Sequence, residues 1–262
     1  MFTLACDRAY LYAHPERDLS VEELGRYNAA VAERASGVPT QYITGHQEFW
    51  GLDLIVSPAV LIPRPETELV IETVLELARG GRTLHSTSSG QALSSDPLRI
   101  ADIGSGAGGI ALALAKEWPQ AEIHAVEISA AALEIARANA ARHRLESRIH
   151  FHQADLLAGF EADSFDFIVS NPPYVGESEE DQVQLEVRKF EPRSAIFAGP
   201  EGTEVIARLI PQARAALRPS GWLVLEISGS IAEDVKRLLR GWHDVLIRPD
   251  LQSIPRVAQA RK

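Results

Sequence analysis

The sequence predicts an α/β protein in which a mostly parallel sheet is covered by helices on both faces. From Leu98 onward, short apolar runs of strand length alternate with longer stretches of helical periodicity. Such alternation is typical of βαβ units, whose parallel strands are joined by crossover helices. A glycine-rich turn between the first of these strands and the helix after it indicates the same class of fold.

The predicted elements give a sheet of about seven strands, whose last hairpin is expected to be antiparallel. Strands are expected near residues 98–103, 121–126, 147–152, 165–170, 221–227, 243–248 and 254–260, and helices near residues 108–117, 129–143, 201–217 and 230–240.

The chain is predicted to contain three parts. Residues 1–46 have helical spacing, and Ser20 with Glu23 fits a capping box, so we expect a small helical N-terminal domain. Residues 47–60 place Gly51 between two β-prone runs and predict a β-hairpin connector. Residues 61–262 would form the sheet domain, with a flexible Ser/Gly-rich insert at residues 79–97.

Composition restricts the class of protein. A formal net charge of -10 favours a protein or small-molecule acceptor over nucleic acid, which attracts clustered Lys and Arg. The single Cys6, a start without a signal-peptide pattern and the lack of a long apolar run predict a cytoplasmic protein without membrane contact, and we expect a monomer. No metal site is expected, because the eight histidines lack paired ligand spacing.

The glycine-rich loop predicts a cofactor site, because glycine lets the backbone turn sharply and come close to a ligand. The spacing of Gly104, Gly106 and Gly108 fits methyltransferases, whereas Gly109 in place of Gly108 fits the dinucleotide fingerprint. A tight turn without a ligand is the third interpretation. The cofactor-binding residues predicted in this segment are Asp102, Gly104, Ser105, Gly106, Ala107 and Gly108.

Three later residues complete the predicted cofactor site. Glu127 ends the next apolar run, where a carboxylate can accept hydrogen bonds from both hydroxyls of a ribose. Its alternative role is to stabilise the start of the following helix. Asp155 and Leu156 follow the third strand and can flank an adenine ring, although Asp155 also fits an exposed loop acid.

The strongest indication of the chemistry is the strand at 165–170, which ends in Asn171-Pro172-Pro173-Tyr174. Ligands of open α/β sheets bind beyond the carboxyl ends of the strands. The side-chain oxygen of Asn171 and the carbonyl of Pro172 can accept two N–H bonds from a planar amide or amino group, on which Tyr174 can stack. We therefore predict methyl transfer to such a nitrogen, with Asn171, Pro172 and Tyr174 as catalytic residues and Pro173 beside them in the substrate site.

Several segments together resemble the PrmC/HemK family of protein-(glutamine-N5) methyltransferases over nearly the whole chain. The block Pro63-Arg64-Pro65-Glu66-Thr67-Glu68 is the most specific of them, since nucleic-acid methyltransferases also carry Asn-Pro-Pro-Tyr. The resemblance implies a class I S-adenosylmethionine-dependent methyltransferase (Rossmann-like) fold. It also implies S-adenosyl-L-methionine as the methyl donor and S-adenosyl-L-homocysteine as the product.

The resemblance further implies that the acceptor is the glutamine of the Gly-Gly-Gln loop in peptide-chain release factors. The glycine loop, Glu127, Asp155, Leu156 and Asn171 would then contact the cofactor, and the N-terminal domain would dock the release factor. Arg64 and Glu66 join the expected substrate site, although they equally fit a lid over the cofactor or the start of a helix. The helical N-terminal region is shorter than is usual in the family, as if a first helix were missing.

Three other functions stay open on the sequence alone. A nucleic-acid N-methyltransferase shares the Asn-Pro-Pro-Tyr motif, but the acidic charge disfavours it. A cofactor-loaded protein that binds a translation factor without methyl transfer is the second. An NAD-dependent oxidoreductase is the third, disfavoured by the motif at the end of the fourth strand.

Overall fold

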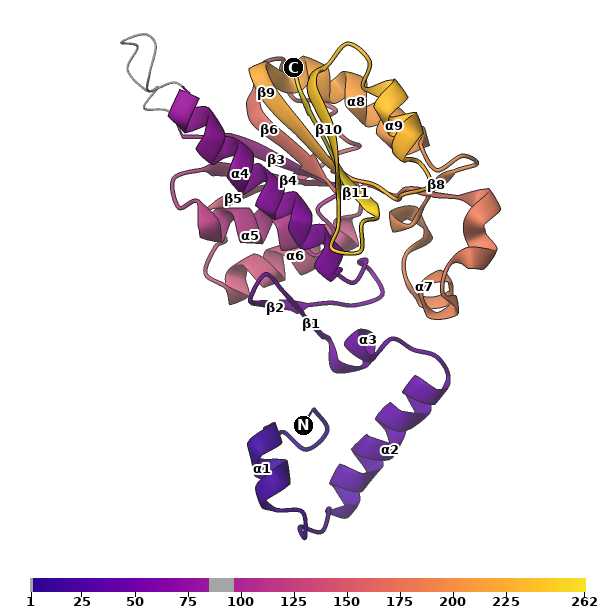
Figure 1. Cartoon of the computed structure of the whole chain (residues 1–262). Coiled ribbons are helices and arrows are strands. Elements are labelled where there is room, and N and C mark those ends of the chain that lie inside the picture. Colours follow the sequence, from indigo (N-terminus) through magenta and orange to yellow (C-terminus); the bar gives the residue numbers. More distant parts are fainter. Residues whose placement is uncertain (1, 85–96) are drawn as a thin grey trace.

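The computed structural model describes residues 2–84 and 97–262 (Figure 1). In this part of the chain seven strands form the main sheet, in the order β10-β11-β9-β6-β3-β4-β5. The strands are β3 (Arg99–Ile103), β4 (Glu122–Glu127), β5 (Ile149–Gln153), β6 (Phe165–Ser170), β9 (Leu217–Glu226), β10 (His243–Pro249) and β11 (Pro255–Arg261). The predicted sheet is confirmed, and β11 is antiparallel to both β9 and β10 as expected for the last hairpin.

Helices cover both faces of this sheet and bury two separate apolar clusters against it. One face carries α4 (Glu68–Leu84), α5 (Gly109–Glu117) and α6 (Ala130–Arg142), and the other carries α8 (Glu204–Ala216) and α9 (Ala232–Leu238). The apolar spacing of α4 explains its position, because Val70, Ile71 and Val74 share one face and are fully buried.

The strand order creates a crevice at the carboxyl ends of β3 and β6. The chain runs outward from β3 through β4 to β5 and then returns to the opposite side of β3 as β6. Ile103 pairs with Ser170 at the end of the two strands, and the Ser170 hydroxyl donates a 2.6 Å hydrogen bond to the Ile103 carbonyl. The loops that follow β3 and β6 therefore begin side by side, which is where open α/β sheets bind ligands.

Smaller elements surround this crevice. A two-stranded parallel sheet pairs β7 (Val175–Gly176) with β8 (Phe197–Gly199), and α7 (Leu185–Phe190) lies between them in sequence. Short 3₁₀ turns are formed by Pro65–Thr67, Glu177–Gln182 and Arg193–Ala195.

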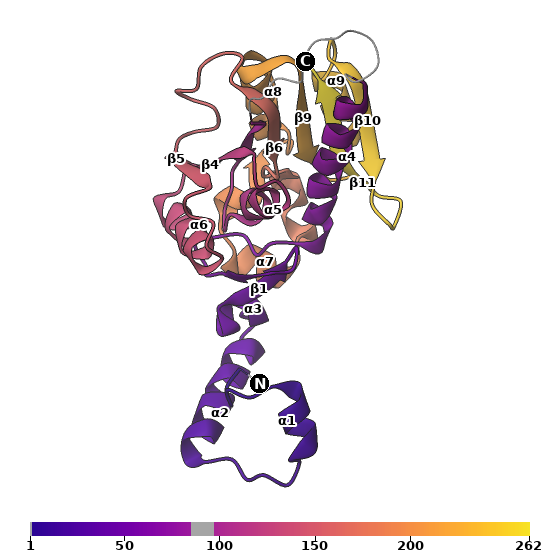
Figure 2. The ribbon, with the colours of Figure 1, turned by 90° about the vertical axis from the view of Figure 1, so that its left-hand side faces the viewer.

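The N-terminal segment forms the predicted helices, named α1 (Arg8–Ala13), α2 (Val21–Ala35) and α3 (Thr40–Thr44). The capping box of α2 is confirmed, because the Ser20 hydroxyl accepts from the Glu23 N–H and the Glu23 carboxylate accepts from the Ser20 N–H. Helices α1 and α2 extend away from the sheet domain (Figure 2). About half of each of Leu24, Tyr27 and Val31 on α2 is exposed to solvent.

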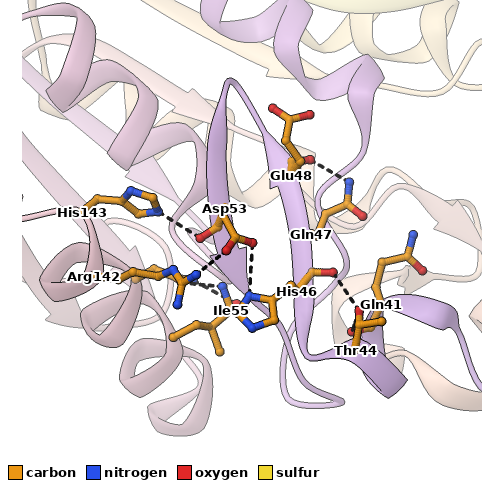
Figure 3. A network of polar contacts seen from close by, with 10 residues as sticks. Gln41, Thr44, His46, Gln47, Glu48, Asp53, Ile55, Arg142 and His143 are labelled. Carbon is orange, nitrogen blue, oxygen red and sulfur yellow. Dashed lines mark hydrogen bonds and ion pairs between the residues drawn. The ribbon is translucent and has the colours of Figure 1, made fainter. Parts of the chain in front are cut away.

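The predicted hairpin is formed by β1 (His46–Phe49) and β2 (Leu52–Ile55). Trp50 and Gly51 both have positive φ angles at its turn, which suits the twist of a two-residue hairpin. Polar contacts join β2 to α6: the Arg142 guanidinium pairs with the Asp53 carboxylate, and His143 Nε2 lies 3.0 Å from the Asp53 carbonyl (Figure 3).

Asn139 of α6 connects the hairpin to the glycine loop. Its side chain is fully buried, and Oδ1 accepts a 2.6 Å hydrogen bond from the Ile55 N–H. The Nδ2 group donates to the Ile55 carbonyl at 3.0 Å and to the Ala107 carbonyl at 2.9 Å. One carboxamide thus satisfies backbone groups of two segments that would otherwise be buried without partners.

One expectation about local structure was wrong in part. Helix α4 continues to Leu84, so residues 79–84, the start of the expected flexible insert, are helical. Glycine inside a helix costs only about 1 kcal/mol, and the packed first turns of α4 offset this cost. Residues 85–96 of the expected insert lie outside the described residues. The division of the chain at residues 46 and 60 stays a prediction.

We expect the Asn139→Ala substitution to lower the free energy of unfolding by roughly 3 kcal/mol, because it removes three hydrogen bonds and leaves buried backbone groups unsatisfied. Urea unfolding followed by circular dichroism would measure this change. Glu134→Ala, an exposed position on the same helix, should change the value by less than about 0.5 kcal/mol. Equal effects of the two substitutions would contradict the role assigned to Asn139.

Candidate active site

The loop after β3 presents its backbone to an open cavity. Gly104 and Gly106 have φ angles of +71° and +53°, and a Cβ added at either position would meet no atom within 4 Å. A Cβ added at Gly108, by contrast, would lie 3.2 Å from the Ala136 Cβ on α6. Two of the predicted glycines therefore leave space for a ligand, and the third permits close packing of the loop against a helix.

The space in front of this loop is a cavity of about 340 Å³, here called the first cavity. Residues predicted for the cofactor site that line it are Gly104, Ser105, Gly106, Ala107, Glu127, Asp155, Leu156 and Asn171. The structure thus brings together residues from the ends of β3, β4, β5 and β6, which the sequence separates by up to 67 positions.

Glu127 lies between the first cavity and the start of α6. It lines the first cavity, and its Oε2 accepts a 3.0 Å hydrogen bond from the Gly106 N–H. Its Oε1 accepts from the Ser129 N–H at 2.9 Å, next to the start of α6. The carboxylate is therefore held in a fixed position between the glycine loop and a helix N-terminus.

Asp102 lies beneath the loop and does not line either of the cavities described here. It is 1% exposed; its Oδ2 accepts a 3.0 Å bond from the Ala111 N–H, and its Oδ1 has no hydrogen-bond partner among the described residues. Burial raises the pKa of this carboxyl to about 7, and the Ala111 N–H opposes that shift. Its observed contact stabilises the first turn of α5, and direct contact with a cofactor stays a prediction.

Asp155 and Leu156 follow β5 and also line the first cavity. Leu156 has a φ angle of +54°, a conformation uncommon for a residue with a side chain. Asp155 is about half exposed and forms a 2.5 Å ion pair with Arg208. Leu156 thus offers an apolar contact to a planar group, while Asp155 already has a partner on α8.

A second cavity of about 530 Å³ also borders Asn171. Asn171, Leu61 and Ala195 line both cavities. The residues predicted for the substrate site divide between them: Pro173 lines the first cavity, Arg64, Glu66 and Tyr174 line the second, and Pro172 is buried between its neighbours. Asn171 therefore stands where a group bound in one cavity would meet a group bound in the other.

The side chains at this junction are held by hydrogen bonds. Asn171 Nδ2 donates to the Thr67 hydroxyl at 3.1 Å, and the Tyr174 hydroxyl donates to Glu226 Oε1 at 3.1 Å. Burial, and then the Glu226 carboxylate, raise the pKa of the Tyr174 hydroxyl above its usual range, so Tyr174 remains protonated.

Arg64 is held by a buried acid. Its guanidinium pairs with Glu191, whose side chain is 1% exposed and whose Oε2 accepts a 3.0 Å bond from the Ile62 N–H. Arg64 also directly precedes the 3₁₀ turn that leads into α4, so its side chain lines the second cavity while its backbone begins a helix. Glu66 is exposed at the same cavity.

Thr67, Glu226 and Arg256 line these cavities but are not among the site residues predicted from the sequence. Glu226 had a usable signal, because it is an acid at the end of a buried strand, and parallel strands end at one edge of the sheet. Among the described residues, no group of three or more His, Cys, Asp or Glu side chains is arranged to hold a metal ion.

The fold and the loops at the strand ends together define the class of protein to which this chain belongs. The described residues form a seven-stranded sheet with an antiparallel last strand, a glycine loop after β3 and an acid at the end of β4, as in the class I methyltransferase fold. Residues 86–189 match the family model of the Methyltransferase small domain. The crystal structure of a methyltransferase from Pyrococcus furiosus has the same fold, with a TM-score of 0.55 at 18% identity over 93% of this chain and 99% of that one.

A second solved structure agrees on the fold. The ribosomal protein L11 methylase from Lactobacillus delbrueckii subsp. bulgaricus gives a TM-score of 0.52 at 21% identity, over 76% of this chain and 80% of that one. Both structures share the fold with this chain, and the matched domain is that of methyltransferases.

Sequence relatives identify the family. The chain is 51% identical to the Release factor glutamine methyltransferase of Koribacter versatilis (strain Ellin345), over 100% of this chain and 88% of that protein. It is 39% identical to the Release factor glutamine methyltransferase of Xylella fastidiosa (strain Temecula1), over 100% of this chain and 90% of that protein. Residues 1–45 match the PrmC N-terminal domain. The chain therefore belongs to the release factor glutamine methyltransferase family, the PrmC/HemK family.

The first cavity suits S-adenosylmethionine. The open space at the Cβ positions of Gly104 and Gly106 allows a ligand to approach the backbone. The Glu127 carboxylate would offer acceptor oxygens to ribose hydroxyls, and Leu156 would offer an apolar surface to adenine, because both line this cavity. When bound there, S-adenosylmethionine supplies an electrophilic methyl group.

We expect the Glu127→Gln substitution to weaken S-adenosylmethionine binding by about tenfold or more, because a charge-assisted hydrogen bond contributes roughly 1.5–3 kcal/mol. Isothermal titration calorimetry would measure the Kd. Glu146→Gln, a change of the same kind at an exposed position, should leave the Kd unchanged. Binding that is equally tight in both variants would remove Glu127 from the cofactor site.

Asp102 should make stability depend on pH. Its pKa is raised in the folded protein from an ordinary value near 3.8 to about 7. The folded state therefore binds a proton that the unfolded state releases, and this contribution to stability falls by about 1.4 kcal/mol per pH unit between those two values. Urea unfolding from pH 4.5 to 7.5 should show this slope as a difference between the parent protein and Asp102→Asn. A constant difference across that range would contradict it.

Proposed function

We propose that the protein transfers the methyl group of S-adenosyl-L-methionine to the side-chain amide nitrogen (N5) of the glutamine in the Gly-Gly-Gln loop of peptide-chain release factors, with S-adenosyl-L-homocysteine as the other product. The observation that carries this proposal is the position of Asn171, which borders both cavities at the end of β6. Membership in the release factor glutamine methyltransferase family supports this choice of acceptor.

The methyl donor would lie in the first cavity. The backbone of Gly104 and Gly106 would face it, Glu127 would accept from its ribose, and Leu156 would pack on its adenine. Asp155 would border the same ring, and Asn171 would limit the cavity on the side of the methyl group.

The glutamine side chain would enter from the second cavity. The side-chain oxygen of Asn171 and the backbone carbonyl of Pro172 would accept its two N–H bonds, because both are acceptors at the end of a rigid Asn-Pro-Pro sequence. The ring of Tyr174 and the side chain of Pro173 would pack against the planar amide, and Arg64 with Glu66 would border the entrance.

The chain's residues would act mainly by positioning. An amide nitrogen is a weak nucleophile because its lone pair is delocalised, so orientation matters more than a strong base. Two acceptors that hold the N–H bonds can aim the nitrogen along the line of attack, and orientation of this kind can contribute on the order of 7 kcal/mol. A carbon–nitrogen bond forms as the carbon–sulfur bond breaks, and the amide then releases one proton to water.

Residues 1–46 would dock the release factor. The half-exposed apolar side chains of α2 (Leu24, Tyr27 and Val31) are suited to packing against a protein surface. We further propose a monomer that acts in the cytoplasm, where release factors work, without direct binding to nucleic acid. The net charge of -10 supports that last point and disfavours a nucleic-acid base as the acceptor.

Incubation with a purified release factor and S-adenosylmethionine is expected to add one methyl group to the Gly-Gly-Gln peptide, measured by mass spectrometry. The product should be absent when the acceptor glutamine is replaced by alanine. Asn171→Ala should lower kcat by at least about 100-fold, because it removes an acceptor that orients the nitrogen.

The control is Gln120→Ala, which removes an exposed carboxamide between α5 and β4, outside the N-terminal segment and outside the cavities described here. Its effect on kcat should be less than twofold. Cofactor binding without any methyl transfer would contradict the proposal, and transfer to tRNA or DNA instead would favour a nucleic-acid acceptor.

A further inference from the structure

Residues 57–64, here called the strap, join the β1–β2 hairpin to the 3₁₀ turn before α4. We propose that Tyr42 of α3 is a positioning residue, which holds the strap in place as a wall of the first cavity although Tyr42 itself lines neither cavity. The N-terminal segment would then complete the cofactor site in addition to docking a partner. The identity of the ligand rests on the proposed function, whereas the contacts concern only this chain.

The strap borders both cavities. Its residues that line the first cavity are Ala59, Val60, Leu61 and Pro63. Leu61 also lines the second cavity, together with Ile62 and Arg64. The position of the strap therefore affects the shape of both cavities.

The strap depends on partners outside itself. It forms neither helix nor strand, so its buried backbone groups have no regular ladder of hydrogen bonds. The Ile62 N–H donates to Glu191 Oε2 at 3.0 Å, which holds one end. Val60, near the other end, is 1% exposed, and its carbonyl accepts a 2.6 Å hydrogen bond from the Tyr42 hydroxyl. Tyr42 and Glu191 are thus two separate anchors of the strap.

The environment of Tyr42 suits this task. Its partly buried ring packs against a small apolar cluster formed by Val56, Val60, Ala107 and Ala132. Ala107 of the glycine loop and Ala132 of α6 also line the first cavity. Burial, and then the Glu191 carboxylate, raise the pKa of the Tyr42 hydroxyl above its usual range. The hydroxyl therefore stays protonated and can donate to the Val60 carbonyl, which can only accept.

Helix α3 holds Tyr42 in a fixed position. Gly45 ends this helix with a φ angle of +76°, and its carbonyl accepts a 3.0 Å hydrogen bond from the Val56 N–H after β2. Figure 3 shows Thr44 of α3 beside His46 of β1, with 3.4 Å between the Thr44 hydroxyl and the His46 carbonyl. The hairpin and α3 are therefore joined, and the Tyr42 hydroxyl is presented to the strap from this joined unit.

The consequence is a cofactor site that is formed before the ligand arrives. A wall that is already ordered does not have to be ordered by the ligand, and this raises affinity. Without the Tyr42 hydroxyl, the Val60 carbonyl loses this donor and the strap has only the anchor at Glu191. Binding of S-adenosylmethionine would then have to order the strap, so affinity should fall, while the rate of the step that follows binding should change little.

Tyr42→Phe tests the inference, because it removes the hydroxyl and keeps the ring in the apolar cluster. The Kd for S-adenosylmethionine, measured by isothermal titration calorimetry without release factor, should rise about fivefold, the change expected from the loss of one neutral hydrogen bond. The value of kcat at saturating S-adenosylmethionine and release factor should stay within twofold, so the substitution should raise the KM for S-adenosylmethionine and leave kcat unchanged.

Hydrogen–deuterium exchange gives a measurement that needs no ligand. The Val60 N–H donates to the Ser57 carbonyl at 3.0 Å and so reports on the end of the strap that Tyr42 holds. In Tyr42→Phe it should exchange at least fivefold faster than in the parent protein. The Ile62 N–H, held by Glu191, should stay within twofold. Mass spectrometry with fragmentation that resolves single amides would distinguish the two positions.

Tyr12→Phe is the matched control. Tyr12 lies on α1, is 77% exposed and lines neither cavity, so the same chemical change there should leave the exchange of Val60 and the Kd within twofold of the parent values. Both quantities are measured without release factor, so a docking role of α1 does not affect them.

The two proposals fail in different ways. Unchanged exchange at Val60, an unchanged Kd, or equal effects of Tyr42→Phe and Tyr12→Phe would overturn the positioning role. A lower thermal unfolding temperature with equally faster exchange at Val60 and Ile62 would also overturn it, because Tyr42 would then only stabilise the fold. Absence of methyl transfer by the parent protein would overturn the proposed function, while the exchange measurement would still decide the role of Tyr42.

Discussion

The parallel pairing of β3 with β6 is the constraint on which the candidate site depends. It places the end of β3 opposite Ser170, with a hydrogen bond from the Ser170 hydroxyl to the Ile103 carbonyl. The glycine loop and the Asn-Pro-Pro-Tyr segment therefore start from adjacent points, although the chain forms β4 and β5 between them. Asn171, the first residue beyond the paired strands, therefore borders both cavities.

Polar groups in the interior hold this site in place, although burying them costs free energy. Asn139 satisfies backbone groups of the hairpin and of the glycine loop, so a connector distant in sequence supports the loop in front of the first cavity. Asp102 and Glu226 are buried carboxyls whose pKa values are raised by desolvation. Such groups stabilise a fold poorly, and here both lie next to functional loops, where they fix the first turn of α5 and the hydroxyl of Tyr174.

The two parts of the chain differ in how they use apolar surface. The sheet domain buries its apolar residues in two clusters on the two sheet faces. Helix α2 has no buried residue and keeps apolar side chains half exposed, and away from its C-terminal end it extends from the sheet domain (Figure 2). This contrast fits a rigid domain for the reaction and an extended segment for contact with a protein partner, as proposed above.

Much of the fold was determined by the sequence alone. The strand at residues 165–170 has the predicted limits, the capping box of Ser20 is present, and the residues predicted for the cofactor site line one cavity, except Asp102 and Gly108. These features depend on local periodicity, on turn chemistry and on the common edge at which parallel strands end. Only the tertiary structure decided that α4 continues to Leu84, that Thr67 contacts Asn171 across 104 positions, and that Glu226 contacts Tyr174. The physical reason is that side-chain partners depend on sheet register and helix packing, which no local pattern contains.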